Sequence, residues 1–314
     1  MYPYNIMQWL FFFYTYCFVG WCFESAYVSI CKRKAINRGF MRGPFLPIYG
    51  SGAIVMLIVS APFRENLLLT YIAGVIGATL LEYITGYCME LLFKVRYWDY
   101  SSQRFNYQGY ICLSSSIAWG FLTILMTRVI HRPIEQFVLG IPNVILSIVT
   151  ILLTIGIAAD FAVAFRTALD LRDVLMRMEK GKEELLRMQK RLDVILAVID
   201  DSKEEIAEGL EQKKEVLTLR TEEVAKGIED RFAKLKNVIY EKPNKYLESM
   251  RDEVAELRGR FSSHTNSETS NISKDFFKRN LIQGNPTMRS TKYNAILEEI
   301  KQEIAEKYNH KKNK

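Results

Sequence analysis

Apolar residues follow two different patterns that divide the chain near residue 160. Before that point they form long continuous runs, and beyond it they recur every three or four residues among charged ones. A helix needs roughly 20 apolar residues to cross a hydrocarbon layer. Five runs meet that length, at residues 6–31, 44–62, 67–93, 111–130 and 137–159. The pattern predicts an all-α polytopic membrane domain over residues 1–160.

The second span is the least regular of the five. It holds two prolines and two glycines in its first half, at Pro44, Pro47, Gly50 and Gly52. Such residues occur where a helix is broken or re-enters the membrane from one side. The sequence leaves open whether this segment crosses fully or is re-entrant.

Residues 161–261 have the spacing of a long cytoplasmic helix. Apolar side chains recur in a 3-4-3-4 pattern at Leu185, Met188, Leu192, Ile195 and Ile199. This spacing is typical of a coiled coil or a long helical hairpin. A single helix from Asp160 to Tyr240 would be roughly 120 Å long at ~1.5 Å per residue.

The remaining tail divides into three parts. Pro243 is expected to end or kink the long helix, before a second helical segment over residues 246–261. Residues 262–290, rich in Ser, Thr and Asn, have the composition of a flexible linker. Residues 291–310 predict an amphipathic helix that docks on the coiled coil, with one apolar face formed by Tyr293, Ile296, Leu297, Ile300, Ile304 and Tyr308.

Charge separates the halves as sharply as hydropathy does. Of 42 Lys and Arg and 35 Asp and Glu, only 11 and 7 lie in the first 160 residues. The tail mixes both signs without a nucleic-acid-binding motif, so no nucleic-acid partner is expected. Five cysteines without C-x-x-C spacing argue against a disulfide scaffold, and three scattered histidines against a metal site. No cofactor is expected either.

Basic residues in the predicted loops indicate the orientation. Eight Lys or Arg follow spans one and three, whereas three follow spans two and four. Because cytoplasmic loops carry the excess of basic residues, the N-terminus is predicted outside and the tail in the cytoplasm.

Three carboxylates fall inside predicted spans, where ionisable residues are costly and are functional candidates by default. Glu24 lies in span one, and Glu82 and Glu90 lie in span three. Glu82 and Glu90 continue a four-residue repeat of small residues, Gly74, Ala78 and Gly86, and therefore share one ridge of the helix.

These acids favour an intramembrane polar site between spans one and three, with a simpler alternative for each. Glu90 can pair with Lys94 at i,i+4, which is the favoured interpretation for that residue. Glu82 can share a proton with a tyrosine or a serine. For Glu24 and Glu82 the functional and structural interpretations stay open.

The loop after span one is predicted to bind an anion or a lipid phosphate. It places Arg38, Arg42 and Gly43 just before a proline-started helix, where free N–H groups and cations favour negative charge. The preceding run of residues 32–34 is explained by orientation and by acidic lipids alone. After span three, Trp98 is an expected interfacial aromatic, and Asp99 could pair with Arg38, Arg42 or Arg96.

These residues also carry a family resemblance. Four motifs occur in fixed order: G-W-x-x-E-x-x-Y from Gly20, R-G-F-x-x-G-P-x-x-P-I-Y-G from Arg38, L-E-Y from Leu81 and W-D-Y from Trp98. Over about residues 18–120 the chain resembles the bacterial membrane proteins known as ABC-transporter type IV permeases. The resemblance implies an integral protein of the bacterial cell (inner) membrane with a permease-like role, and gives no substrate or catalytic residue.

The sequence contains no G-x-x-x-x-G-K-[ST] phosphate loop, and five spans are few for a complete pathway. The first functional hypothesis is therefore a non-enzymatic, oligomeric transport component that has a polar intramembrane site and relies on a separate ATPase. The second is a membrane-anchored coiled-coil assembly or signalling protein, a homo-oligomer through its coiled coil. The third is a membrane-embedded enzyme or a binder of anionic lipid head groups, with Glu24 or Asp99 as base.

Overall fold

The computed structural model describes residues 3–218 and 222–312 of the chain, and almost all of its regular structure is helical. The described chain forms two compact units. Unit 1 comprises Met1–Met176 and Thr269–Lys314, and unit 2 comprises Arg177–Glu268. Two long helices, α6 (Asn143–Thr218) and α7 (Glu222–Lys274), continue from one unit into the other.

The apolar runs of unit 1 form helices close to the predicted spans. Helix α1 covers Ile6–Lys32, and α3 covers Leu67–Phe93. Together with Leu113–Leu139 and the start of α6, they make four helices long and apolar enough to cross a membrane. The second segment, Pro47–Phe63, is a shorter apolar helix made of α2 (Pro47–Ser60) and a 3-10 turn. The all-α membrane fold is confirmed, although span two is shorter than the others.

The fourth and fifth spans have different limits from those predicted. After α4 (Leu113–Leu125), a π-helical turn (Met126–Ile130) leads directly into α5 (His131–Leu139), so Arg128 and Arg132 lie in helix and not in a loop. Pro133 stands in the first turn of α5, where proline is tolerated. The chain turns only at Gly140 and Pro142, and α6 begins at Asn143.

A small apolar core joins these helices. Its fully or nearly fully buried members come from α1, α2, α3, the π-helical turn, α5 and α6: Phe12, Tyr16, Ala53, Met56, Leu57, Ala78, Met126, Val138 and Leu146. Large apolar side chains also remain exposed on the outer faces of the same helices, as in Leu68, Ile76 and Leu152. Lipid can cover such faces, because it is as apolar as they are.

The loop between α3 and α4 contains the only two strands of the described residues. Strands β1 (Asn106–Tyr107) and β2 (Ile111–Cys112) pair antiparallel. Their turn contains Gly109 at φ +74, where a Cβ would lie 2.6 Å from Ser101 Oγ. The turn therefore requires glycine for both its backbone angle and its close packing.

The C-terminal part of unit 1 is folded. Helix α7 continues to Lys274, and Asp275 caps α8 (Phe276–Gly284) by accepting hydrogen bonds from the N–H groups of Phe277 and Lys278. This corrects the flexible linker predicted over residues 262–290. The polar side chains of that segment are used within the fold, as Thr269, Ser273, Asn285 and Ser290 are all buried.

The last helix, α9, covers Asn294–Lys312 and has the predicted amphipathic pattern. Five members of its predicted apolar face are buried, namely Tyr293, Ile296, Leu297, Ile300 and Ile304. The sixth, Tyr308, has a side chain outside the described residues. Lys307 donates to Ser273 Oγ on α7 at 2.8 Å, so α9 lies against the end of α7 within unit 1.

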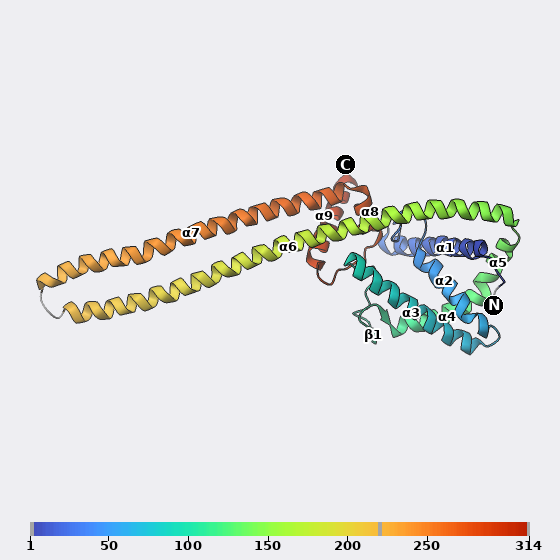
Figure 1. The fold of residues 1–314 in the computed structure, drawn as a ribbon, viewed down its shortest axis with the longest axis horizontal. Coiled ribbons are helices and arrows are strands. Elements are labelled where there is room, and N and C mark those ends of the chain that lie inside the picture. The colour runs from blue at the N-terminus through green and yellow to red at the C-terminus, as the bar shows by residue number, and fades with distance from the viewer. Residues whose placement is uncertain (1–2, 219–221, 313–314) are drawn as a thin grey trace. The chain divides into compact units, whose positions relative to one another are not determined.

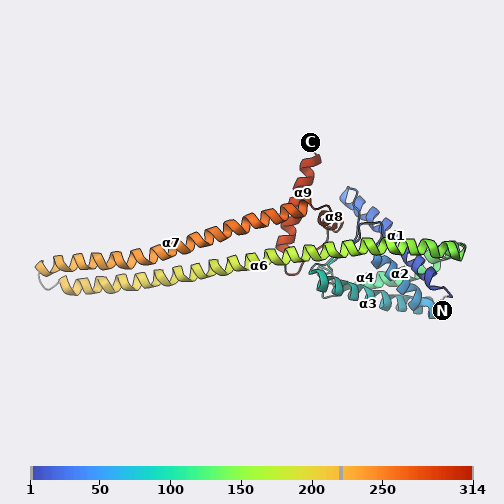
Figure 2. The same ribbon diagram turned by 45° about the horizontal axis from the view of Figure 1, so that its top comes forward.

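Unit 2 consists of two long helices that run antiparallel (Figure 1, Figure 2). A Cβ on Gly181 of α6 would lie 3.0 Å from the ring of Phe261 on α7, so the helices touch there. From the sequence, a coiled coil and a long helical hairpin are both possible for this segment, and one helix is predicted up to Tyr240. The structure has a hairpin, with α6 ending at Thr218 and α7 helical through Pro243.

Candidate functional site

Glu82 is buried in α3, with 5% of its surface exposed. Its carboxylate accepts hydrogen bonds from three neutral donors: Tyr100 Oη at 2.9 Å, Trp119 Nε1 at 2.9 Å and Ser115 Oγ at 3.3 Å. Tyr100 belongs to the loop after α3, whereas Ser115 and Trp119 belong to α4. Glu82 therefore connects α3 both to this loop and to its neighbouring helix.

The small-residue ridge around Glu82 is what brings α3 and α4 together. Gly74, Ala78, Glu82 and Gly86 are all buried on one face of α3. A Cβ on Gly74 would lie only 2.2 Å from Thr123 Oγ1 of α4. Small residues at such positions let two helices approach closely in a membrane.

Glu90, two turns further along α3, has a charged partner. Arg96 Nε donates to it at 2.6 Å and Tyr110 Oη at 2.5 Å, and Thr291 of the C-terminal segment donates to its other oxygen. The predicted partner, Lys94, instead ends the helix with a left-handed backbone at φ 59. The Glu90 carboxylate thus gathers the loop after α3 and the C-terminal segment.

Trp98 and Asp99 belong to the same cluster. Trp98 Nε1 donates to the carbonyl oxygen of Tyr110 at 2.9 Å. Asp99 lies 3.7 Å from Arg96 and 3.9 Å from Arg289, and accepts hydrogen bonds from the Ser101 side chain and N–H group. Burial alone would raise the pKa of Asp99, but these hydrogen bonds and the two guanidinium groups hold it below its ordinary value.

Glu24 on α1 forms a second ion pair at the start of the next loop. Its oxygens accept hydrogen bonds from Arg38 Nε at 3.3 Å and from Tyr49 Oη of α2 at 2.6 Å. The backbone N–H of Arg38 donates to Ser25 Oγ at 3.1 Å. Glu24 and its neighbour Ser25 therefore fix the position of Arg38.

Arg38 also holds the C-terminal segment of unit 1. Its Nη1 donates to the Gly284 carbonyl at 3.2 Å and to Asn285 Oδ1 at 3.1 Å. Asn285, 2% exposed, returns a hydrogen bond from Nδ2 to the Gly39 carbonyl at 2.9 Å. One guanidinium thus bridges α1 and the end of α8.

Backbone atoms extend this attachment to the loop after α3. Arg96 and Arg289 exchange two main-chain hydrogen bonds, at 2.6 and 2.9 Å, as an isolated antiparallel bridge. Ser290 Oγ donates to the Lys94 carbonyl at 2.6 Å, and Thr287 Oγ1 to the Tyr97 carbonyl at 3.0 Å. We call residues 284–291 the clamp segment, because they contact both the loop after α1 and the loop after α3.

The predicted anion site at Gly43 is filled by the chain itself. Asp160 Oδ2 of α6 accepts from the N–H groups of Gly43 at 2.7 Å and Arg42 at 3.2 Å. The Arg42 side chain points elsewhere, with its guanidinium 3.9 Å from the ring centre of Phe277 on α8. These backbone donors therefore bind a carboxylate, while the Arg42 charge stays separate from it.

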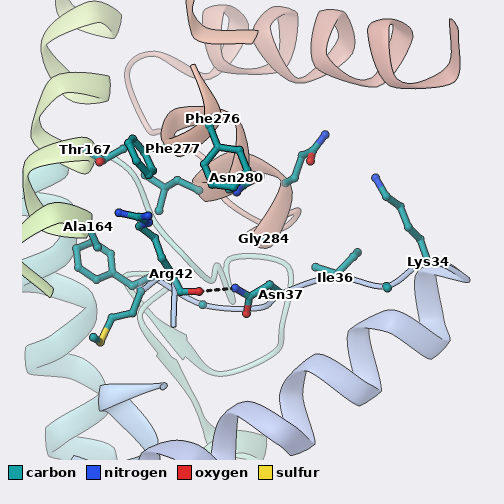
Figure 3. A pocket seen from close by; sticks show the side chains of 16 residues that line it. Lys34, Ile36, Asn37, Arg42, Ala164, Thr167, Phe276, Phe277, Asn280 and Gly284 are labelled. Atoms are coloured by element: carbon teal, nitrogen blue, oxygen red, sulfur yellow. Dashed lines mark hydrogen bonds between the residues drawn. The ribbon is translucent and has the colours of Figure 1, made fainter. Parts of the chain in front are cut away.

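A pocket of about 390 Å³ opens beside Arg42 (Figure 3). It is bounded by the loop of residues 34–42, by Ala164 and Thr167 of α6, and by α8. Figure 3 also shows the hydrogen bond from Asn37 Nδ2 to the Arg42 carbonyl, 2.7 Å long, which shapes the loop.

The structure therefore divides the predicted site residues into four groups, of which Arg42 and Gly43, beside Asp160, are one. Glu24 and Arg38 lie together, and Glu90, Trp98 and Asp99 share the cluster around Arg96 and Tyr110. Glu82 stands apart with neutral donors. Each acid has hydrogen-bond donors around it, and the pocket of Figure 3 lies beside Arg42 instead of between the acids.

Sequence reasoning missed a polar cluster around His131, which is buried in α5. Tyr16 Oη lies 2.6 Å from its Nδ1, Tyr4 Oη lies 3.0 Å from its Nε2, and Tyr4 also donates to Glu135. In the sequence, His131 is one of three scattered histidines without metal-ligand spacing. Its four-residue spacing to Glu135 was the available signal, since such residues lie on one helix face.

Asp160 and the clamp residue Asn285 were also missed. Asp160 directly follows the fifth apolar run, and an acid at that position indicates only that the span has ended. Asn285 lies in the supposed linker, and its partners Gly39 and Arg38 are 246 and 247 residues away in sequence. Only the tertiary fold reveals these contacts.

The helices and their polar connections define an integral membrane protein. Residues 11–165, the membrane region of the chain, match the family model described as "Putative ABC-transporter type IV". The match also includes the fifth span, which lies beyond the four motifs that carry the resemblance. No curated protein and no solved structure matches the chain. The protein is thus a transport-related membrane component.

Proposed function

We propose that the chain is a non-enzymatic, permease-like subunit of an oligomeric transporter in the bacterial inner membrane, powered by an ATPase on a separate chain. The family match supports a role in transport, and the sequence has no phosphate-binding loop of its own. The excess of basic residues after spans one and three supports an outside N-terminus and a cytoplasmic tail.

The clamp segment supports this function most directly. It ties the loops after α1 and α3 to the end of the tail, through Arg38, Arg96 and Glu90. Both helices of unit 2 continue into unit 1, one through α6 and the other through α7 and the clamp. A force applied to the hairpin by a partner would therefore reach the membrane helices along continuous α6, and through α7 and the hydrogen bonds of the clamp.

In this proposal the three acids form the intramembrane polar site and act as coupling ties. Glu24 and Glu90 connect spans to the clamp, and Glu82 connects α3 to α4. Paired acids of this kind can break and re-form when helices shift, because their partners lie on separate segments. Association of several hairpins supplies the oligomer.

The test begins with purification from native membranes in mild detergent, followed by native mass spectrometry. An oligomer with a stoichiometric ATPase is expected. In that complex, Asn285→Ala should lower the ATPase rate or uncouple it from transport, because the clamp loses three hydrogen bonds. Gln302→Ala, an exposed amide on α9, is the matched control and should behave as wild type.

A second candidate is a membrane-anchored assembly protein, favoured by the length of the paired helices in unit 2. Removing residues 192–250 and joining the helices by a short Gly-Ser linker separates the two. Loss of oligomerisation in a purified protein that never carried an ATPase would support the assembly function. An intact ATPase complex whose rate changes with hairpin length would support the transport subunit.

A further inference from the structure

Arg42 lies at the border of two cavities within unit 1. One is the pocket of Figure 3, about 390 Å³ in volume, which we call the head-group pocket. The other is a groove of about 560 Å³ between the loop at Arg42 and Phe45 and the membrane-spanning part of α6, which we call the α6 groove. Arg42 belongs to the lining of both.

The head-group pocket has the chemistry of an anion site. Its lining contains two cations, Lys34 and Arg42, and no carboxylate. Neutral polar groups complete it, including Asn37 and Asn280, whose side-chain amides carry N–H donors. An acid-free pocket with two cations is complementary to a phosphate group.

The α6 groove has the chemistry of a hydrocarbon site. Most of its lining is apolar, with Val149, Leu152, Leu153 and Ile157 on α6 and Phe45 opposite. Leu152 is 64% exposed, so the groove opens outward at the level of a membrane span. Gly156 lies in it with open space where a side chain would stand.

Arg42 is built to serve both cavities. Its backbone N–H is held by Asp160, which fixes the loop without using the guanidinium. The guanidinium rests on the Phe277 ring at 3.9 Å, and no carboxylate in the described part of the chain is paired with it. Asp160, at the polar end of the groove, has its Oδ2 occupied by two backbone donors.

We propose that the two cavities together bind one anionic phospholipid, with its phosphate in the head-group pocket beside Arg42 and an acyl chain in the α6 groove. The charge of the pocket matches the phosphate, and the groove reaches the hydrocarbon layer from which a lipid enters. A soluble anion would use the pocket alone, and a helix of a second copy would use the groove alone. Only a lipid has both chemistries in one molecule.

Two substitutions test the two halves of this site in the full-length protein. Arg42→Gln removes the cation and keeps the backbone N–H that Asp160 needs. Gly156→Leu places a side chain in the groove, at a position where an added Cβ meets no atom within 4 Å. Matched controls are Arg104→Gln, an exposed arginine in another loop, and Gly52→Leu, whose added Cβ also meets no atom within 4 Å.

The measurement is native mass spectrometry of each detergent-purified variant titrated with dioleoyl phosphatidylglycerol or dioleoyl phosphatidylcholine. Wild type should retain one phosphatidylglycerol. Arg42→Gln should weaken that affinity about tenfold, since a charge-assisted hydrogen bond is lost. Gly156→Leu should weaken it at least as much, while both controls should bind as wild type with unchanged melting temperatures.

Three results would overturn the proposal. Arg42→Gln could bind phosphatidylglycerol as tightly as Arg104→Gln does. Excess inorganic phosphate could displace the lipid from the wild type while Gly156→Leu still binds normally, which would assign the pocket to a soluble anion. Gly156→Leu could change only the oligomeric state, which would assign the groove to a second copy. None of these readouts depends on an ATPase, so they are independent of the proposed transport function.

Discussion

Glu82 and Glu90 lie on the same face of α3, two turns apart, and their surroundings differ in kind. Glu82 is held by a tyrosine, a serine and a tryptophan, with no cation paired to it among the described residues. Glu90 is paired with Arg96 and reaches the clamp segment. At Glu82, neutral donors satisfy the buried carboxyl group without burying a second charge. At Glu90, which lies nearer the end of the helix, the partner is a charged arginine. The first acid joins helices, and the second joins the tail to the membrane half.

The largest effect is expected from Glu82→Ala. Tyr100 and Trp119, two part-buried donors, would lose their acceptor, at about 1–3 kcal/mol of unfolding free energy for each one left unsatisfied, whereas Ser115 also donates to the Cys112 carbonyl. Glu82→Gln keeps an acceptor oxygen and should lose much less. Thermal unfolding of both variants in the same detergent measures the difference. Equal losses in the two variants would show that the charge of Glu82, and not its hydrogen bonds, stabilises this region.

A smaller but still large effect is expected from Arg96→Ala. Removing one partner of a part-buried ion pair leaves Glu90 uncompensated, at a cost of roughly 3 kcal/mol. The loss should also loosen the clamp, so limited proteolysis should cut within residues 284–291 faster than in wild type. Arg104→Ala, in the same loop but exposed, is the control and should change stability by no more than about 0.5 kcal/mol. Faster cleavage of the clamp segment without a loss of unfolding free energy would show that the Arg96–Glu90 ion pair orders the clamp segment but does not stabilise the fold.

The smallest effect is expected from Asp99, through pH. Its folded-state pKa lies below the ordinary value of 3.8, so the ionised form stabilises the fold above that pH. This contribution is lost as the pH falls below 3.8 and the carboxylate becomes protonated. Asp99→Asn should therefore lower the melting temperature at pH 7, and its difference from wild type should shrink at pH 3.5. A difference that is constant with pH would mean that the charge of Asp99 adds no stability.

The sequence predicts the helices of the membrane half well, because their signal is local. The third span, residues 67–93, has the limits of α3. The boundary between spans four and five was missed because Arg128, Arg132 and Pro133 suggest a loop, yet all three fit within a helix. Polar residues near a span end do not by themselves stop a helix, since their side chains can reach the interface.

The polar site was predictable only in part, for the same reason. The acids are recognisable as costly residues, and their ridge follows from four-residue spacing. Their partners are not recognisable, because Tyr100, Trp119 and Thr291 come from segments brought close by tertiary folding. The supposed linker shows this most clearly, since its Ser, Thr and Asn residues suit a solvated loop and equally suit a docked segment with distant acceptors.

The bridge between Arg96 and Arg289 uses main-chain atoms alone, which affects how this protein can change in evolution. The bridge itself does not restrict the side chains at these positions, because every residue except proline offers the same donor and acceptor, although Arg96 is also needed for its ion pair with Glu90. The number of residues between α8 and α9 cannot drift as freely, since one insertion would shift Thr287 and Ser290 out of register with Tyr97 and Lys94. Related chains should therefore preserve the length of this segment more strictly than its amino-acid sequence.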